Sequence, residues 1–157
     1  MNTLNIHWQR LVSESGGTCS RCELTQKEVK NAYRSLKRSL APLGIKVTLE
    51  EKTFDSAACA KDVSQSNRIW IGEHPLEEWL GAKVGKSHCE GCCAELGAEA
   101  ECRTIEVDGR TYEKIPAKLI IKAGLLAASE RLSSEQDKPC CPKKTCSKTV
   151  SSSCCPK

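Results

Sequence analysis

The chain has 157 residues, a formal net charge of +4, twelve cysteines and only 4% aromatic residues. This length is most simply one domain with an appendage. No segment combines a dense basic patch with interleaved aromatic residues, so a nucleic-acid partner is not expected.

What the high cysteine content indicates depends on the cellular compartment of the protein. The first residues lack a basic region followed by a long apolar stretch, and no later segment is apolar enough to span a membrane. A cytoplasmic location without a membrane partner is therefore expected. Because cytoplasmic thiols are kept reduced, twelve cysteines there favour metal binding or redox catalysis over a disulfide framework.

The first part of the chain predicts strands on either side of one long helix. Apolar and polar residues alternate over residues 4–12, which is typical of a strand. Strands are also predicted over residues 45–49 and 68–71. Between the first two strands, a helix that ends near Pro42 and Gly44 is indicated by apolar residues three or four apart: Val29, Ala32, Tyr33, Leu36 and Leu40.

The second part predicts helices around a hairpin. His74–Pro75 should open a short helix that carries Leu76, Trp79 and Leu80. Residues 81–101 are rich in glycine, cysteine and charge, which indicates a loop or a short helix held by something other than packing. Over residues 104–113 an Asp-Gly pair between extended flanks predicts a hairpin. Pro116 should be the first residue of a helix that runs to about Leu132 and buries Leu119, Ile120, Ala123, Leu126 and Ala127.

The composition changes after Leu132. Residues 133–157 contain one aliphatic residue, Val150, and carry a net charge of +3. Such a segment cannot offset its chain entropy by burial, so it is expected to be disordered without a ligand. The predicted organisation is a domain over residues 1–132, with an insertion at about 81–102, followed by a flexible Cys/Lys/Ser-rich tail.

The first cysteine motif is Cys19-Ser-Arg-Cys22, between the first strand and the long helix. A helix N-terminus carries partial positive charge that stabilises a thiolate, and Arg21 adds to it. Cys19 is expected to be the attacking thiol and Cys22 the resolving one. A buried structural pair, or half of a zinc site, is the alternative. Capping boxes fit the same region at Ser20 with Glu23 and at Thr25 with Glu28.

This order of elements looks like the thioredoxin fold, and the chain resembles a thioredoxin-like family of bacteria and archaea whose domain has no assigned function. The resemblance rests on these segments: Trp8-Gln-Arg-Leu-Val12, Thr18-Cys-Ser-Arg-Cys22, Ser66-Asn67, Ile69-Trp-Ile-Gly72, Pro75-Leu-Glu-Glu-Trp-Leu80, Cys89-Glu-Gly-Cys-Cys93 and Cys102-Arg103. It implies an α/β fold with a central mixed sheet flanked by helices. Ordinary thioredoxins place a cis-proline opposite the CxxC motif, where it hinders metal capture, whereas the comparable position here is Asn67.

The second cluster consists of Cys89, Cys92, Cys93 and Cys102. Four thiolates suit a tetrahedral zinc ion, and equally copper(I), mercury(II), arsenic(III) or an iron–sulfur cluster. The expected cofactor is therefore a thiolate-bound soft ion, and no organic cofactor is indicated. Two interpretations stay open: a structural metal that staples the insertion, and a functional thiol site that faces Cys19 and Cys22. Incidental or disulfide-bonded cysteines are the third possibility.

The third cluster is the tail, where a Cys-Cys-Pro-Lys sequence occurs twice. Lysines beside each pair favour the thiolate. Adjacent cysteines bond poorly to each other, because their Cα atoms are about 3.8 Å apart and disulfides need about 4.4–6.8 Å. A tethered set of thiols can collect a soft ion or reduce an oxidised CxxC motif. The tail thiols are Cys140, Cys141, Cys146, Cys154 and Cys155.

The leading functional hypothesis is a protein that binds or transfers a thiophilic metal or metalloid, as in detoxification. The alternative is a thiol–disulfide oxidoreductase that uses Cys19 and Cys22, has the tail as a thiol relay and works with a thiol-redox partner protein. A structural or interaction domain with a zinc staple and no turnover is the third hypothesis.

Overall fold

The computed structural model describes residues 2–12, 20–54, 65–88 and 101–136. A four-stranded mixed sheet lies at the centre of this part, in the order β2-β1-β3-β4. The parallel strands β1 (Asn2–Leu11) and β2 (Ile45–Phe54) are followed by the antiparallel strands β3 (Arg68–Ile71) and β4 (His74–Pro75). The α/β class with a mixed sheet is thus confirmed.

The predicted long helix is α1 (Ser20–Leu40). Its buried residues follow the predicted spacing along one face: Cys22, Thr25, Val29, Ala32, Leu36 and Leu40. The helix ends as predicted at Pro42 and Gly44, through the short 3₁₀ helix η1 (Ala41–Leu43). Gly44 has φ 71°, a left-handed conformation that glycine adopts without cost, and its N–H donates to the Ala41 carbonyl at 3.0 Å.

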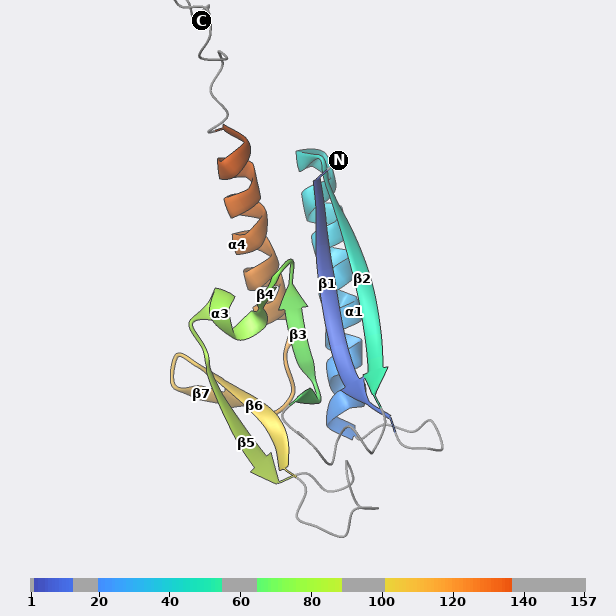
Figure 1. The fold of residues 1–157 in the computed structure, drawn as a ribbon, viewed down its shortest axis with the longest axis vertical. Coiled ribbons are helices and arrows are strands. Elements are labelled where there is room, and N and C mark those ends of the chain that lie inside the picture. Colours follow the sequence, from blue (N-terminus) through green and yellow to red (C-terminus); the bar gives the residue numbers. More distant parts are fainter. Residues whose placement is uncertain (1, 13–19, 55–64, 89–100, 137–157) are drawn as a thin grey trace, which may run out of the picture.

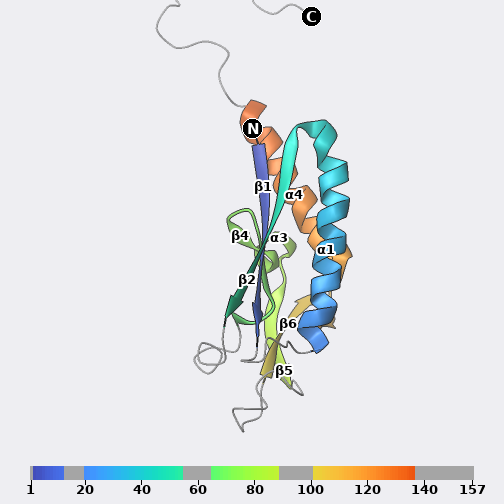
Figure 2. The same ribbon diagram turned by 90° about the vertical axis from the view of Figure 1, so that its right-hand side faces the viewer.

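The helices cover one face of the sheet. In Figure 2 the strands β1 and β2 are seen nearly edge-on, with α1 on one side of them and α4 (Ala117–Gln136) packed alongside α1. Leu4, Ile6 and Trp8 of β1 point into this core and are 0% exposed. The alternating residues of β1 face the other side and are polar, so β1 shows the period-two pattern that its sequence predicted.

A second sheet corrects one expectation. Residues 83–88, predicted as part of a loop or short helix, form the strand β5 (Lys83–His88). It pairs with β6 (Glu101–Val107), which forms the predicted hairpin with β7 (Arg110–Tyr112). All but one residue of β5 are exposed, so pairing rather than burial holds it and its sequence shows no apolar alternation. Figure 1 shows this sheet toward the end of the molecule at which β1 and β2 finish.

Both C-terminal helices are present, with changed details. The short helix α3 (Leu76–Leu80) confirms the prediction after His74–Pro75. Helix α4 begins one residue after Pro116 and runs to Gln136, beyond the expected end near Leu132. The predicted burial of Leu119, Ile120, Ala123 and Ala127 is confirmed, whereas Leu126 is 42% exposed, so that part of the prediction is wrong. No helix of the described ranges is long and apolar enough to cross a membrane.

Gly124 marks a close approach between α4 and α1. A Cβ atom at this position would lie 2.5 Å from Cδ1 of Leu36, whose side chain is 0% exposed. We expect Gly124→Val to lower the free energy of unfolding by about 2 kcal/mol through overpacking, measured by urea denaturation in reductant. Leu36→Ala should relieve part of this cost, so strictly additive losses in the double variant would contradict the prediction.

Candidate functional site

The described residues include two of the predicted site cysteines, Cys22 and Cys102, and both are buried. The other predicted ligands and nucleophiles lie outside the described residues: Cys19, Cys89, Cys92, Cys93 and the tail thiols Cys140, Cys141, Cys146, Cys154 and Cys155. The site is therefore built below from the described side chains that surround these positions.

Cys22 lies in the first turn of α1 and is 1% exposed. Its sulfur is 3.6 Å from the hydroxyl oxygen of Ser66, which is also 1% exposed and comes just before β3. The N-terminus of α1 brings the partial positive charge of the helix dipole to this end of the helix. Cys22 is thus a buried thiol with a buried hydroxyl as its neighbour.

Asn67 holds the backbone next to Ser66 through a buried hydrogen-bonded network. Its carboxamide oxygen accepts from Trp8 Nε1 at 3.1 Å, and its Nδ2 donates to Thr25 Oγ1 at 3.1 Å. Asn67 is 6% exposed and has φ 60°, a left-handed conformation in which asparagine is enriched. The network joins β1, α1 and the turn before β3, so it fixes the wall that faces Cys22.

Thr25 and Glu28 join α1 to the start of α4. The capping-box prediction for this pair is wrong, because α1 begins at Ser20 and both residues lie inside it. Thr25 Oγ1 instead accepts from the Ile115 N–H at 3.4 Å, and Glu28 Oε2 accepts from the Ala117 N–H at 2.7 Å. A carboxylate at the first residue of α4 stabilises that helix N-terminus, so Glu28 caps a different helix from the one predicted.

Arg21, between the two cysteines of the CxxC motif, binds the end of β5. Its guanidinium donates to Ser87 Oγ at 2.8 Å and to the His88 carbonyl at 2.6 Å. It also forms an ion pair with Glu113 at 2.9 Å, and Ser87 Oγ donates to the same carboxylate at 3.0 Å. The Arg21 side chain is 17% exposed. The sequence predicted Arg21 only as a local positive charge, and nothing in its spacing indicated the partner strand.

Cys102 lies in β6, directly opposite Ser87 in the register of the β5–β6 pair, and is 4% exposed. The next residue, Arg103, is 6% exposed and pairs with the carboxylate of Glu77 on α3. This partly buried ion pair connects the second sheet to α3. Within the described ranges no three or more His, Cys, Asp or Glu side chains gather in a way that could hold a metal ion. Cys102 thus lies in β6, the partner strand of β5, whose end binds Arg21. The other predicted ligands of its cluster lie outside the described residues.

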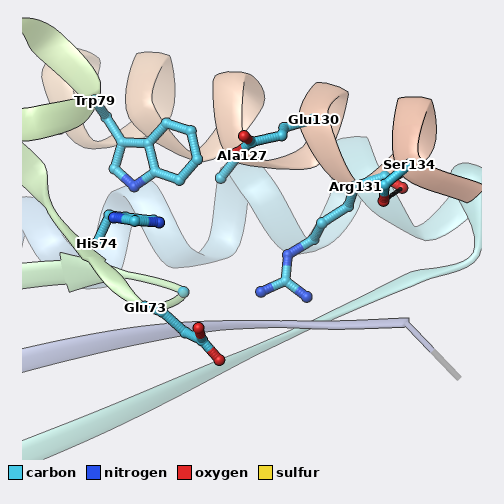
Figure 3. Close-up of a pocket in the computed structure, with 8 residues that line it drawn as sticks. Glu73, His74, Trp79, Ala127, Glu130, Arg131 and Ser134 are labelled. Carbon is cyan, nitrogen blue, oxygen red and sulfur yellow. Dashed lines mark hydrogen bonds between the residues drawn. The ribbon is translucent and has the colours of Figure 1, made fainter.

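A pocket of about 330 Å³ lies between the β3–β4 turn, α3 and α4 (Figure 3). Figure 3 shows the Arg131 guanidinium directed into the space beside Glu73, with His74 and Trp79 forming one wall. A Cβ atom at Gly72 would lie 3.1 Å from Arg131 Nη2, so the glycine leaves room for that side chain. Neither of the two described cysteines, Cys22 and Cys102, is among the residues that line this pocket.

The described residues define an α/β protein with a buried thiol in the first turn of the helix that follows its first strand. Residues 4–124 match the family described as Domain of unknown function (DUF2703), and the chain belongs to this family. It is also similar to a protein of Archaeoglobus fulgidus whose printed name is "Uncharacterized protein", with 39% identity over 117 residues, 74% of this chain and 82% of the relative. No solved structure matches the chain. The expected membership of a family whose domain has no assigned function is thus confirmed.

Proposed function

We propose that the domain is thioredoxin-like and that it binds or transfers a thiophilic metal or metalloid of the zinc, copper, arsenic or mercury class through cysteine thiolates. The thioredoxin-like part of the proposal is supported by topology. A parallel β1-α1-β2 unit is followed by the antiparallel pair β3 and β4 and by α4, and the sheet order is β2-β1-β3-β4. Cys22 lies at the start of α1 beside the turn before β3, where this resemblance expects the thiol pair.

The main support for the metal-binding part of the proposal is the contact of Arg21 with the end of β5. Arg21 is two residues from Cys19 and one from Cys22, and its guanidinium binds the carbonyl of His88, which directly precedes Cys89. Consecutive Cα atoms are about 3.8 Å apart. The described residues that flank two of the cysteine clusters are thus in direct contact, which supports a shared thiol site at this end of the molecule.

The chemistry of such a site follows from the ligand type. Thiolates are soft donors that select zinc, copper(I), mercury(II) and arsenic(III) over hard cations. Binding displaces the thiol protons, so positive charge from Arg21 and from the α1 N-terminus favours it. The tail thiols would add five further soft donors on the same chain, able to deliver an ion to the domain or remove it. We propose a cytoplasmic location, where the thiols stay reduced.

Native mass spectrometry of the reduced chain, challenged in turn with zinc, arsenite and mercury(II), tests the proposal. The full chain should retain a soft ion, and a chain that ends at Gln136 should retain less because five thiols are removed while all of α4 is kept. If one tightly bound zinc ion is retained both after this truncation and in Cys19→Ser, it would instead indicate a structural zinc. Absence of uptake for all three ions overturns the proposal.

The burial of Cys22 beside Ser66 favours one second candidate, a thiol–disulfide oxidoreductase. In that reaction the Cys19 thiolate attacks a substrate disulfide, forms a mixed disulfide and releases one substrate thiolate. Cys22 then attacks the Cys19 sulfur, which releases the second thiolate and leaves an oxidised CxxC motif. Reduction of a model disulfide that is lost in Cys19→Ser, in a chain that takes up no soft ion, would establish this candidate over the first.

A further inference from the structure

Strand β2 forms one edge of the central sheet and pairs, among the described strands, with β1 alone. It is ten residues long, from Ile45 to Phe54. An edge strand presents a row of unpaired backbone N–H and C=O groups that can pair with another strand. Proteins blunt such edges with short strands, bulges or prolines, and the sequence of β2 contains no proline.

An apolar groove borders this edge. Its volume is about 360 Å³, and it is lined by Tyr33 and Lys37 of α1 together with Ile45 and Val47 of β2. Leu49, two residues farther along β2, is only partly buried against the core. An incoming strand could therefore bury apolar side chains on the helix-covered face while its backbone extends the sheet.

The charges on the other face of β2 select one antiparallel register for a second copy of the same strand. If two copies cross at Thr48, each Lys46 lies opposite the other copy's Glu50, and each Val47 lies opposite the other copy's Leu49. A shift of the crossing point to Leu49 would place Lys46 opposite Lys52. A shift to Glu50 would place that carboxylate opposite itself. A shift to Val47 would place Lys46 opposite Thr48 and Glu50 opposite Gly44, so among these registers only the crossing at Thr48 forms both ion pairs.

The present contacts of Glu50 and Lys46 leave both side chains able to form ion pairs with a second copy. The Glu50 side chain is 64% exposed, and its contacts with described residues are long: Asn5 Nδ2 at 3.4 Å and His7 Nδ1 at 3.5 Å. Lys46 is exposed and has no ion pair among the described residues. Neither side chain would have to leave a buried position to reach its opposite charge across the interface.

We propose that the chain forms a homodimer through antiparallel pairing of β2 with β2 around Thr48. The two sheets join into one, with the helices of both copies on the same face. Phe54, where β2 ends, is six residues from the twofold axis and lies at the same end of the domain as Cys22. At roughly 3.3 Å per strand residue, the Phe54 ends of the two copies lie about 40 Å apart. Each copy would therefore keep its own thiol site, and one ion could not bridge the two described ends.

Charge-reversal variants of the full chain test the register, with sedimentation velocity measured in excess phosphine reductant so that tail disulfides cannot mimic a dimer. The wild-type chain should be dimeric. Lys46→Glu and Glu50→Lys should each raise the dimer dissociation constant by about tenfold or more, because two symmetric attractive pairs become repulsive. An equimolar mixture of the two variants should regain the dimer, since both cross-strand pairs are then of opposite charge.

Lys52→Glu is the matched control. Lys52 lies on the same strand and face, but opposite Gly44 in this register, so its reversal should leave the dissociation constant within about twofold. The double variant Lys46→Glu/Glu50→Lys should dimerise like the wild type. A wild-type chain that stays monomeric to several hundred micromolar overturns the proposal, and so does a dimer that both single variants leave intact. Variants that fold by circular dichroism but do not regain the dimer on mixing overturn the register.

Discussion

Asn67→Ala should lower the free energy of unfolding by about 3 kcal/mol, measured by urea denaturation in reductant. The substitution removes the acceptor for Trp8 Nε1 and the donor to Thr25 Oγ1, both in a buried environment. A buried polar group left without its partner costs about 1–3 kcal/mol. Alanine also loses about 1 kcal/mol in the left-handed conformation that Asn67 adopts at φ 60°.

Two further variants separate these causes. Asn67→Gly removes the same hydrogen bonds but tolerates the positive φ, so it should cost roughly 1 kcal/mol less than the alanine variant. Asn31→Ala makes the same chemical change at an exposed position on α1, where the side chain accepts one long hydrogen bond, from Arg34 at 3.4 Å, and should change stability by less than about 0.5 kcal/mol. Equal losses at positions 67 and 31 would show that the network does not stabilise the fold.

The local pattern of the sequence was sufficient for the elements that bury an apolar face. Strand β1, helix α1 and strand β3 were predicted because their side chains alternate or recur at the period of the element. The hairpin was predicted because an Asp-Gly pair suits a turn with two positive φ values, and Asp108 and Gly109 adopt 52° and 74°.

Elements held by pairing rather than burial were missed. Strand β5 is almost wholly exposed and contains Lys, Gly, Ser and His, so its sequence carries neither apolar alternation nor high strand propensity. The wrong prediction for Leu126 has a related cause, because α4 is apolar on more than one side and the period alone does not say which side meets α1. Tertiary contacts decide both cases.

In the candidate site, too, the sequence indicated individual residues but not their tertiary contacts. The sequence identified Cys22, and the resemblance pointed to Asn67 as the residue facing the thiol pair. Their partners Trp8, Thr25 and Ser66 come from three separate segments, and no spacing rule relates residues 59 or 44 positions apart. A tryptophan and a threonine on the buried faces of neighbouring elements were a usable signal, since buried indole and hydroxyl groups require hydrogen-bond partners.

The N-terminal part of α1 thus carries four residues that contact other parts of the fold. Cys22 presents the thiol toward Ser66, Thr25 holds Asn67, and Glu28 caps α4. Arg21 reaches in the other direction, to the second sheet. These contacts connect the start of α1 to the turn before β3, to the start of α4 and to the second sheet. Arg21→Ala removes the contact with β5 and leaves the contacts of Cys22, Thr25 and Glu28 in place, so it is the variant that tests the proposed shared site.

Arg21→Ala should raise the apparent dissociation constant for zinc by about tenfold or more, measured on the reduced full chain by competition with a chromogenic chelator. Residues that orient metal ligands from outside the coordination sphere typically contribute 10–100-fold to affinity. In the proposed site Arg21 would have this role, because its guanidinium holds Ser87 and the His88 carbonyl beside the start of α1. The same variant should increase amide hydrogen exchange in β5, because that strand is held by pairing and by this guanidinium.

Arg21→Lys distinguishes charge from geometry. It keeps the positive charge near the thiols but cannot contact Ser87, His88 and Glu113 with one planar fork, so its zinc affinity should fall between those of the wild type and the alanine variant. Arg34→Ala is the matched control on an exposed part of α1 and should leave the affinity unchanged. Faster exchange in β5 with unchanged zinc affinity in Arg21→Ala would mean that the guanidinium holds the second sheet in place without organising a metal site, and the shared site would have to be abandoned.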